Sequence, residues 1–195
     1  MNHQLDKKLQ QGNAIDSITL GGVSVGEVTE LCGENATGKT QLVLQASIAC
    51  QLRPSLGGMH IRVIVVDSIA SICTSHFENI VDGLESRSQL LRAIGYGLQS
   101  IAATYNVAVI VVNNVVDVFP SDRDSSTHFM MSSGRKVRPT LGMGWARNIE
   151  TRLFFTKTLN PSTQMFGRLC SILLSTTLEL NACRFKITEQ GVPDA

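Results

Sequence analysis

The stretch that decides the fold runs from Leu31 to Gln41 and reads Leu-Cys-Gly-Glu-Asn-Ala-Thr-Gly-Lys-Thr-Gln. It contains the phosphate-binding pattern GxxxxGKT and directly follows a β-type run from Glu27 to Cys32. Gly33 and Gly38 allow backbone conformations that aim successive N–H groups inward, so the loop can wrap a polyphosphate without side-chain clashes. The pattern therefore predicts a nucleotide-binding site.

The side chains after the second glycine complete this predicted site. Lys39 is expected to reach the β and γ oxygens of the nucleotide, and Thr40 to offer its hydroxyl to Mg²⁺. The helix expected from about Gln41 to Leu52 points its positive end at the anion. The residues expected to contact ATP are Gly33, Glu34, Asn35, Ala36, Thr37, Gly38, Lys39, Thr40 and Gln41.

An acidic residue ends the next apolar run. The segment from Ile61 to Asp67 reads Ile-Arg-Val-Ile-Val-Val-Asp, which predicts a parallel strand buried on both faces, with Ser68 directly after its end. In nucleotide hydrolases a carboxylate at this place holds Mg²⁺, usually through water, so Asp67 is predicted to join Thr40 as a metal residue. The alternative is an acid that merely ends a strand at the surface.

A polar amide follows the next strand-like run. Apolar residues recur at helical spacing from Glu85 to Tyr105, and an apolar run from Val107 to Val112 comes after them, which predicts a second βαβ unit. Behind this run stands Asn114, whose amide could hydrogen-bond the γ-phosphate or the attacking water. Asparagine is also common in turns. Both interpretations of Asn114 stay open at this stage.

The segment from Val116 to Pro139 shows no periodicity and exceeds the usual length of a connector, so we expect a functional loop or disorder. It carries the basic residues Arg123, Arg135, Lys136 and Arg138. A flexible basic tip can neutralise nucleic-acid phosphates independently of base sequence. The alternative is a solvated charge run that binds nothing.

Three strands joined by turns are expected near the end of the chain, as a meander-like extension of the sheet. They span Ile149 to Thr156, Leu169 to Ser175 and Ala182 to Ile187. Residues 1–16 read as a polar N-terminal lead, and residues 17–195 as the core. This organisation predicts a mostly parallel α/β sheet with added strands at one side.

Composition narrows the class of protein. With 195 residues, 43% of them apolar and 17% charged, the chain can form one domain with a sizeable core. The net charge is only +1, so nucleic-acid contacts would need a local basic patch. The five cysteines form no CxxC pair and indicate reduced thiols of a cytosolic or nuclear protein. No apolar run approaches the roughly 20 residues that span a bilayer, and no signal peptide is expected.

Several separated segments together resemble the eukaryotic branch of the RecA-like recombinases. These segments are Leu20 to Gly33, Gly38 to Gln41, Val63 to Ser68, Val112 to Val115, Pro139 to Asn148 and Cys183 to Val192. The similarity covers nearly the whole chain and is strongest to one of the recombinase paralogues. It implies a RecA-like P-loop ATPase core, in which a mostly parallel sheet is flanked by helices and extended by antiparallel strands at its C-terminal end.

The resemblance also implies a function. Such proteins bind ATP and Mg²⁺ and act with DNA in homologous recombination and double-strand-break repair, in the nucleus and also in the cytoplasm. The implied partners are single-stranded or branched DNA, the C-type recombinase paralogue and the strand-exchange recombinase, with no membrane. The region from Phe77 to Glu85 takes the role of the first DNA-binding loop and Val116 to Pro139 that of the second, while Arg87 aligns with an arginine at the start of the following helix.

The chain departs from this family pattern in three ways. The family places a strand ending in an acid, together with helices, between the phosphate loop and the Asp strand, but Lys39 and Asp67 are only about 28 residues apart, the minimum for one βαβ crossover. The glutamate that would activate the attacking water is therefore missing. Asn114 replaces a glutamine and is one methylene shorter. The helical N-terminal domain is reduced to a short lead.

Three functional interpretations follow. The first is a shortened mediator subunit that binds ATP and DNA weakly and hydrolyses ATP slowly or not at all. The second is a competent DNA-dependent ATPase that takes its missing carboxylate from Glu34, Glu78 or a partner subunit. The third is a remnant that binds no nucleotide and only contacts partners. Under each of them, loss of a strand from the sheet is expected to leave an unpaired edge.

Overall fold

The computed structural model describes residues 8–9, 14–51, 61–77, 83–119, 129–159, 166–189 and 191–192. The helices are α1 (Ala14–Ile18), α2 (Lys39–Ala49), α3 (Ile69–Phe77), α4 (Gly83–Tyr105) and α5 (Gly142–Ala146). The strands are β1 (Lys8–Leu9), β2 (Val23–Ser24), β3 (Val28–Gly33), β4 (Val63–Val66), β5 (Ala108–Asn113), β6 (Val115–Asp117), β7 (Met130–Ser132), β8 (Arg135–Pro139), β9 (Thr151–Leu159), β10 (Phe166–Ser175) and β11 (Ala182–Phe185).

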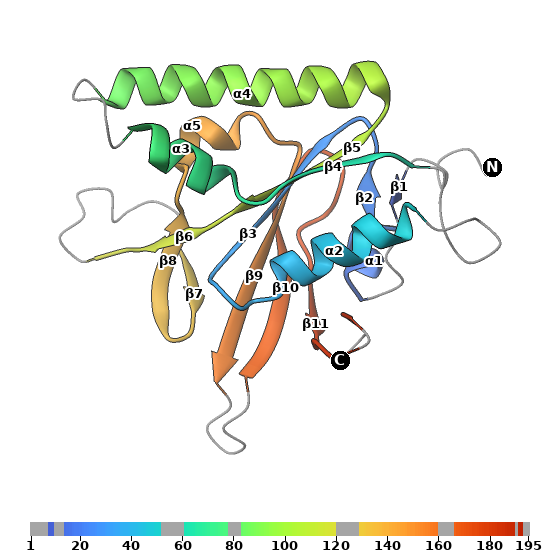
Figure 1. Cartoon of the computed structure of the whole chain (residues 1–195). Coiled ribbons are helices and arrows are strands. Elements are labelled where there is room, and N and C mark those ends of the chain that lie inside the picture. The colour runs from blue at the N-terminus through green and yellow to red at the C-terminus, as the bar shows by residue number, and fades with distance from the viewer. Residues whose placement is uncertain are drawn as a thin grey trace.

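A six-stranded sheet with the order β11-β10-β9-β3-β5-β4 forms the centre of the molecule. β3 pairs in parallel with β5 and with β9, and β5 pairs in parallel with β4. β10 runs antiparallel to both β9 and β11. Helix α4 lies on one side of this sheet and α2 on the other (Figure 1). The predicted mostly parallel sheet with a C-terminal antiparallel extension is confirmed.

The two middle strands explain why the sheet forms where it does. Every residue of β3 and of β5 is buried, because each strand has a neighbour on both sides and helices above and below. β5 is built almost entirely from Val, Ile and Ala, the composition expected of a parallel strand covered on both faces. Together these strands fix the position of the loop that follows β3.

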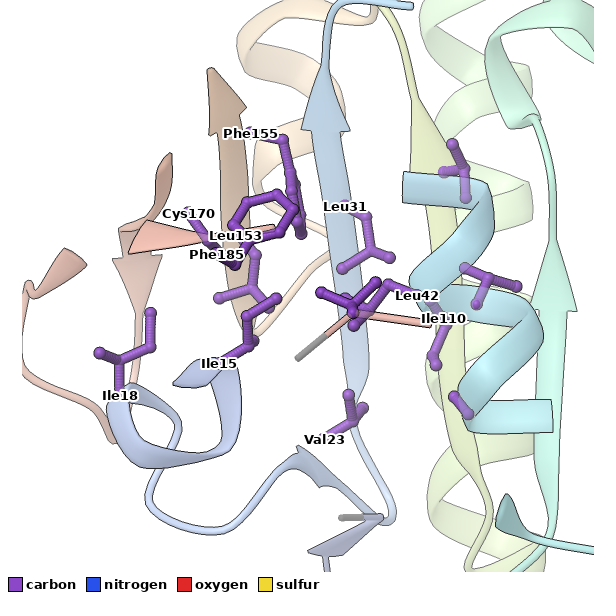
Figure 2. Close-up of a cluster of buried hydrophobic side chains, with 14 of the residues drawn as sticks. Ile15, Ile18, Val23, Leu31, Leu42, Ile110, Leu153, Phe155, Cys170 and Phe185 are labelled. Atoms are coloured by element: carbon purple, nitrogen blue, oxygen red, sulfur yellow. The ribbon is translucent and has the colours of Figure 1, made fainter. Parts of the chain in front are cut away.

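Two hydrophobic clusters fill the space on the two faces of the sheet. The first joins α1, α2 and the sheet, and Figure 2 shows Ile15, Leu31, Leu42 and Phe155 converging in it. In this cluster the rings of Phe155 and Phe185 meet edge to face with centroids 5.7 Å apart. The second cluster joins the sheet to α3, α4 and α5. Because α1 contributes Ile15, the packed region includes part of the expected polar lead.

The strand that precedes Asp67 is not buried on both faces, so that prediction was wrong. All four residues of β4 are partly exposed, because β4 is the last strand of the sheet and has β5 as its one neighbour within the described ranges. No strand is described between α2 and β4, although residues 52–60 lie outside the described part of the chain. The short crossover therefore leaves the outer edge of β4 without a pairing strand there.

The segment from Val116 to Pro139 is neither a plain loop nor wholly irregular. Its described residues include β7, β8 and most of β6, which form a separate three-stranded antiparallel sheet in the order β6-β8-β7. β7 and β8 are joined by a two-residue turn, in which Ser133 and Gly134 both have positive φ, at 50° and 76°. That geometry suits a tight hairpin. The strands are too short for a periodic pattern to reveal them.

Other boundaries differ slightly from expectation. Helix α2 begins at Lys39 rather than at Gln41, and α4 begins at Gly83, inside the region from Phe77 to Glu85 that was expected to be a DNA-binding loop. Residues 78–82 of that region lie outside the described part. None of the helices in the described part has the length and apolar character that crossing a membrane demands.

Candidate nucleotide-binding site

The predicted phosphate loop lies between the end of β3 and the start of α2. Its glycines are required by close contacts as well as by backbone angles. A Cβ atom on Gly33 would lie 2.4 Å from the carbonyl oxygen of Phe155, and one on Gly38 would lie 2.9 Å from Cδ1 of Ile187. Gly38 also has a φ of 107°. Any larger residue at Gly33 or Gly38 would therefore collide with the neighbouring strand or segment and distort the phosphate loop.

Lys39 is held inside this loop by its own backbone. Its Nζ donates hydrogen bonds to the carbonyl oxygens of Gly33 at 2.8 Å and Glu34 at 2.7 Å, and the residue is only 6% exposed. Burial lowers the pKa of Lys39, while the negative charge of Asp67 partly opposes that shift. Neutral carbonyls satisfy the donors but do not balance the charge, so a phosphate at the loop would stabilise the ammonium group.

The two residues predicted to hold Mg²⁺ meet in the structure. The hydroxyl of Thr40, at the start of α2, donates a hydrogen bond of 2.9 Å to Oδ2 of Asp67, which follows β4. The two oxygens come from segments 27 residues apart in the sequence. A hydroxyl and a carboxylate are oxygen ligands of the kind that Mg²⁺ binds alongside phosphate and water. The donor set therefore fits the expected ion.

A cavity of about 570 Å³ opens in front of these groups. It is lined by Asn35, Ala36, Thr37, Gly38, Lys39, Thr40, Gln41, Asp67, Ser68, Ser71, Val112, Asn114, Arg168 and Ile187. The structure thus brings together most of the predicted ATP-binding residues with Asp67 and Asn114. No phosphate-loop pattern contains Ser71, Arg168 and Ile187. Ser71 lies on α3, directly after β4 and Asp67, whereas β10 and the segment after β11 reach the cavity through sheet pairing.

Glu34, the acidic residue of the phosphate loop, faces the β7–β8 hairpin instead of this cavity. It is 7% exposed, and its Oε2 accepts a hydrogen bond from Ser133 at 3.1 Å. The same oxygen lies 3.2 Å from Nη2 of Arg135 and 3.7 Å from Nζ of Lys157. Glu34, Arg135 and Lys157 line a second cavity, of about 630 Å³, which Asn114 also lines. Glu34 therefore ties the phosphate loop to the hairpin.

The surroundings of Glu34 make it a poor general base. Burial acts to raise the pKa of this carboxyl, but hydrogen bonds from Ser132 and Ser133 and the positive charges of Arg135 and Lys157 outweigh burial and lower it. A carboxylate whose proton affinity is reduced in this way accepts a proton from water less readily. Glu34 is thus unsuited to act as the general base that the competent-ATPase interpretation requires, and Glu78 lies outside the described residues.

Three of the four residues predicted to contact DNA lie on one strand, β8, and Arg123 lies outside the described part. Arg135 is already engaged, since its Nη1 donates to both carboxylate oxygens of Asp117, at 2.8 and 2.9 Å, in addition to facing Glu34. Lys136 is exposed and its Nζ lies 4.5 Å from the centre of the Phe129 ring. Arg138 is partly buried. Lys136 is therefore the basic side chain of the three that is most open to a phosphate.

A buried carboxylate that the sequence analysis did not single out lies beneath the site. Glu30 on β3 is fully buried, and its Oε1 accepts hydrogen bonds from Asn113 Nδ2 at 2.8 Å and Trp145 Nε1 at 2.9 Å. Its other oxygen accepts a hydrogen bond from Arg152 on β9. The network connects β3, β5, β9 and α5, and it fixes the residue directly before Asn114. No local pattern marks Glu30, because its partners are far away in the sequence.

The five cysteines are all free, as the sequence predicts, and three of them are buried. Burial raises the pKa of the Cys32 thiol and of the Cys170 thiol. Both groups therefore stay protonated near neutral pH and are unsuited to act as nucleophiles.

Comparisons with known proteins agree with this architecture. A family model described as Rad51 matches residues 8–80 and 56–195. The chain is 23% identical to a DNA repair protein XRCC3 homolog of Arabidopsis thaliana, with 96% of this chain and 93% of the relative covered. It is 23% identical to the DNA repair protein rhp57 of Schizosaccharomyces pombe, with 83% and 72% covered. A solved RadB recombinase has a TM-score of 0.65 at 20% identity, with 96% of this chain and 99% of that chain covered.

The same comparisons show that the chain is shorter than the relative from Arabidopsis. The alignment with the Arabidopsis relative extends over 282 positions, many more than the 195 residues of this chain, so it contains long gaps. Residues 56–80, which include β4 and Asp67, fall within both pieces matched by the family model. The overlap of the two matched pieces agrees with the short crossover before β4.

The paralogue that the sequence segments resemble is X-ray repair cross-complementing protein three. A mouse DNA repair protein XRCC3, 26% identical over 136 residues, is also among the relatives, so the resemblance to this branch is confirmed. The family model covers far more than half of the chain, and the RadB structure shares its fold. The chain therefore belongs to the Rad51 family.

Proposed function

We propose that this chain binds ATP with Mg²⁺ and acts as a mediator subunit in homologous recombination and double-strand-break repair, with slow or absent hydrolysis. The observation that carries the proposal is the meeting of Thr40 and Asp67, 2.9 Å apart, at the mouth of a loop that buries Lys39. An ammonium group, a loop of inward N–H groups and two oxygen ligands are the parts that a nucleotide triphosphate with Mg²⁺ requires. The names of the relatives support the role in DNA repair.

Weak hydrolysis follows from what lines the cavity. Among the described residues, Asp67 is the one carboxylate there, and its proposed task is to hold the metal. Glu34 instead contacts Arg135 and Ser133 of the hairpin. Asn114 lines the cavity and can contact the γ-phosphate, but an amide cannot take a proton from water. Without a base, positioning and charge stabilisation remain, and turnover is expected to be slow.

Contacts with DNA and with other subunits complete the proposal. We infer that single-stranded or branched DNA meets the basic face of the β7–β8 hairpin through Lys136 and Arg138, together with Arg123 and a released Arg135. The proposed protein partners are the C-type recombinase paralogue and the strand-exchange recombinase, and the proposed location is the nucleus and also the cytoplasm. Capture of the C-type paralogue by this chain, repeated with ATP and with Lys39→Ala, tests the pairing.

Hydrolysis is tested by measuring phosphate release with and without single-stranded DNA. We expect the purified chain to bind ATP but to release phosphate at a rate that single-stranded DNA does not raise. If single-stranded DNA stimulates phosphate release and Lys39→Ala abolishes it, the chain is instead a competent DNA-dependent ATPase. Failure of ATP with Mg²⁺ to raise the melting temperature would support the third interpretation, the remnant that binds no nucleotide.

DNA binding is predicted to depend on the carboxylates that hold Arg135. Asp117→Asn removes the charge that Nη1 of Arg135 contacts at 2.8 Å, so the guanidinium becomes easier to release to a phosphate. We expect affinity for single-stranded DNA to rise severalfold at low salt. Lys136→Ala should lower the affinity and reduce the slope of log K against log salt by about 0.7, the value for one phosphate contact on a single strand. Fluorescence anisotropy over a salt series measures both.

The control for this prediction is Glu179→Gln, which removes one negative charge from an exposed position outside the hairpin. It changes the net charge as Asp117→Asn does, and it should leave the affinity nearly unchanged. Equal gains for the two variants would show that only overall charge matters, and the hairpin would lose its proposed role.

A further inference from the structure

Arg168 on β10 is a cation that lines the nucleotide cavity, and it forms no ion pair with any residue that the structure describes. It is partly buried, it lines the cavity, and its Nε is shielded from solvent. Within the described part of the chain this Nε has no hydrogen-bond partner. A guanidinium is charged at every physiological pH, and a shielded donor without a partner is unfavourable. Such a group calls for an acceptor that the described residues do not provide.

Sheet register determines which way Arg168 faces. It lies opposite Lys157 on β9 and opposite Phe185 on β11, so the three side chains share one face of the sheet. Phe185 belongs to the wall that touches the phosphate loop, because a Cβ on Gly38 would lie 3.2 Å from its ring and 2.9 Å from Ile187. The C-terminal antiparallel strands therefore form one side of the cavity, with Arg168 and Ile187 in it.

The opposite side of the cavity is where the metal is proposed to bind. In the sheet, β3 lies between β5 and β4 on one side and β9 and β10 on the other. Asp67 follows β4, whereas Arg168 lies on β10, so the two residues flank the phosphate loop from opposite directions. The β- and γ-phosphates and Mg²⁺ belong with Thr40 and Asp67. The far side, with its one cation and one aliphatic side chain, is then left for the other end of the nucleotide.

From this arrangement we infer that Arg168 binds the α-phosphate of the nucleotide and that Ile187 packs against the adjoining nucleoside. The inference rests on the proposed nucleotide binding and adds a residue that the phosphate-loop pattern does not contain. A charged donor facing a phosphate oxygen forms a charge-assisted hydrogen bond, the stronger class of such bonds. Because the α-phosphate is common to ATP and ADP, Arg168 strengthens the binding of both.

The test is isothermal titration calorimetry of the full chain with ATP and with ADP, each with Mg²⁺. We expect Arg168→Ala to weaken both nucleotides by about tenfold or more, which is the loss of one charged hydrogen bond, and to leave the ratio of the two affinities unchanged. Arg168→Lys should recover part of the loss. The matched control is Arg184→Ala on the neighbouring strand, which removes an exposed arginine that pairs with Leu169 and so lies on the opposite face.

The melting temperature of the nucleotide-free chain gives a second test, and unlike the nucleotide affinity it is not expected to fall. Without nucleotide, Arg168→Ala removes a shielded charge that lacks a partner, so the melting temperature of the free chain should stay the same or rise. This also shows that the variant folds. Binding of both nucleotides within twofold of wild type, or a loss for ATP alone, would overturn the inference while the proposed ATP binding stands. A wild-type chain that binds neither nucleotide would overturn both.

Discussion

Replacing Lys39 by alanine is expected to weaken the binding of ATP with Mg²⁺ by roughly 100-fold, the upper range for loss of a charged hydrogen-bonding group. Lys39 is the one positively charged side chain of the loop, and hydrogen bonds to the carbonyl oxygens of Gly33 and Glu34 hold its Nζ there. At a concentration 100 times its dissociation constant, ATP should stabilise the wild-type chain by about 2.7 kcal/mol. For a chain of this length that is roughly 5–10 °C in melting temperature. The variant should lose nearly all of this shift.

The rise in melting temperature on adding ATP must be measured against the nucleotide-free form of the same variant, because Lys39 also supports the empty loop. Its Nζ holds the carbonyl oxygens of Gly33 and Glu34, so Lys39→Ala leaves both without that donor and is expected to melt at a lower temperature even without nucleotide. Arg92→Ala removes an exposed cation from α4, on the other side of the sheet, and should keep the full shift. A shift in Lys39→Ala equal to that of wild type would show that ATP binds elsewhere or not at this loop.

The phosphate loop could be read from the sequence because its chemistry is local. The glycines, the lysine and the threonine lie within eight residues, and the strand and helix around them carry strong patterns of their own. The partnership of Thr40 with Asp67 was also predictable, since parallel strands bring their carboxyl ends to one edge of a sheet. Local sequence and simple topology together determined this half of the site.

The other half depends on pairing between distant strands, which no local pattern encodes. Arg168 reaches the cavity because β10 pairs with β9 and β11 in one register, and a shift by a single residue would turn it to the opposite face. The contact between Glu34 and Arg135 could not be predicted either, because the two residues are 101 positions apart in the sequence. Composition predicted a basic loop but could not show that carboxylates already hold one of its arginines.

The edge position of β4 has the same origin. A run of four β-branched residues before an acid is typical of a strand covered on both sides, and the sequence gives no sign that its outer neighbour is missing except the short distance from Lys39. The apolar pattern suits a longer sheet, whereas the sheet formed by the described residues ends at β4. The half-exposed strand therefore reflects a conflict between local composition and topology.

The second large effect is expected in the network around Glu30. Glu30→Gln keeps the size of the side chain but removes the charge that Arg152 faces, leaving a mostly buried guanidinium without its counter-ion. Breaking a buried pair from one side destabilises a protein by about 3–5 kcal/mol. We expect the urea midpoint of the variant to fall accordingly with little change in the slope m. Glu179→Gln, the same chemical change at an exposed position, should stay within about 0.5 kcal/mol of wild type.

A double variant separates the charge from the rest of the network. Glu30→Met with Arg152→Met replaces the pair by apolar side chains of similar length, so neither charge is left alone, and the loss should be smaller than the sum of the two single losses. It should not vanish, because Asn113 and Trp145 still lose the acceptor that they share at 2.8 and 2.9 Å. Asn113 directly precedes Asn114, so nucleotide affinity measured on the double variant would also show whether this network holds the cavity in shape. Additive losses would mean that Glu30 and Arg152 act independently, which their direct hydrogen bond does not allow.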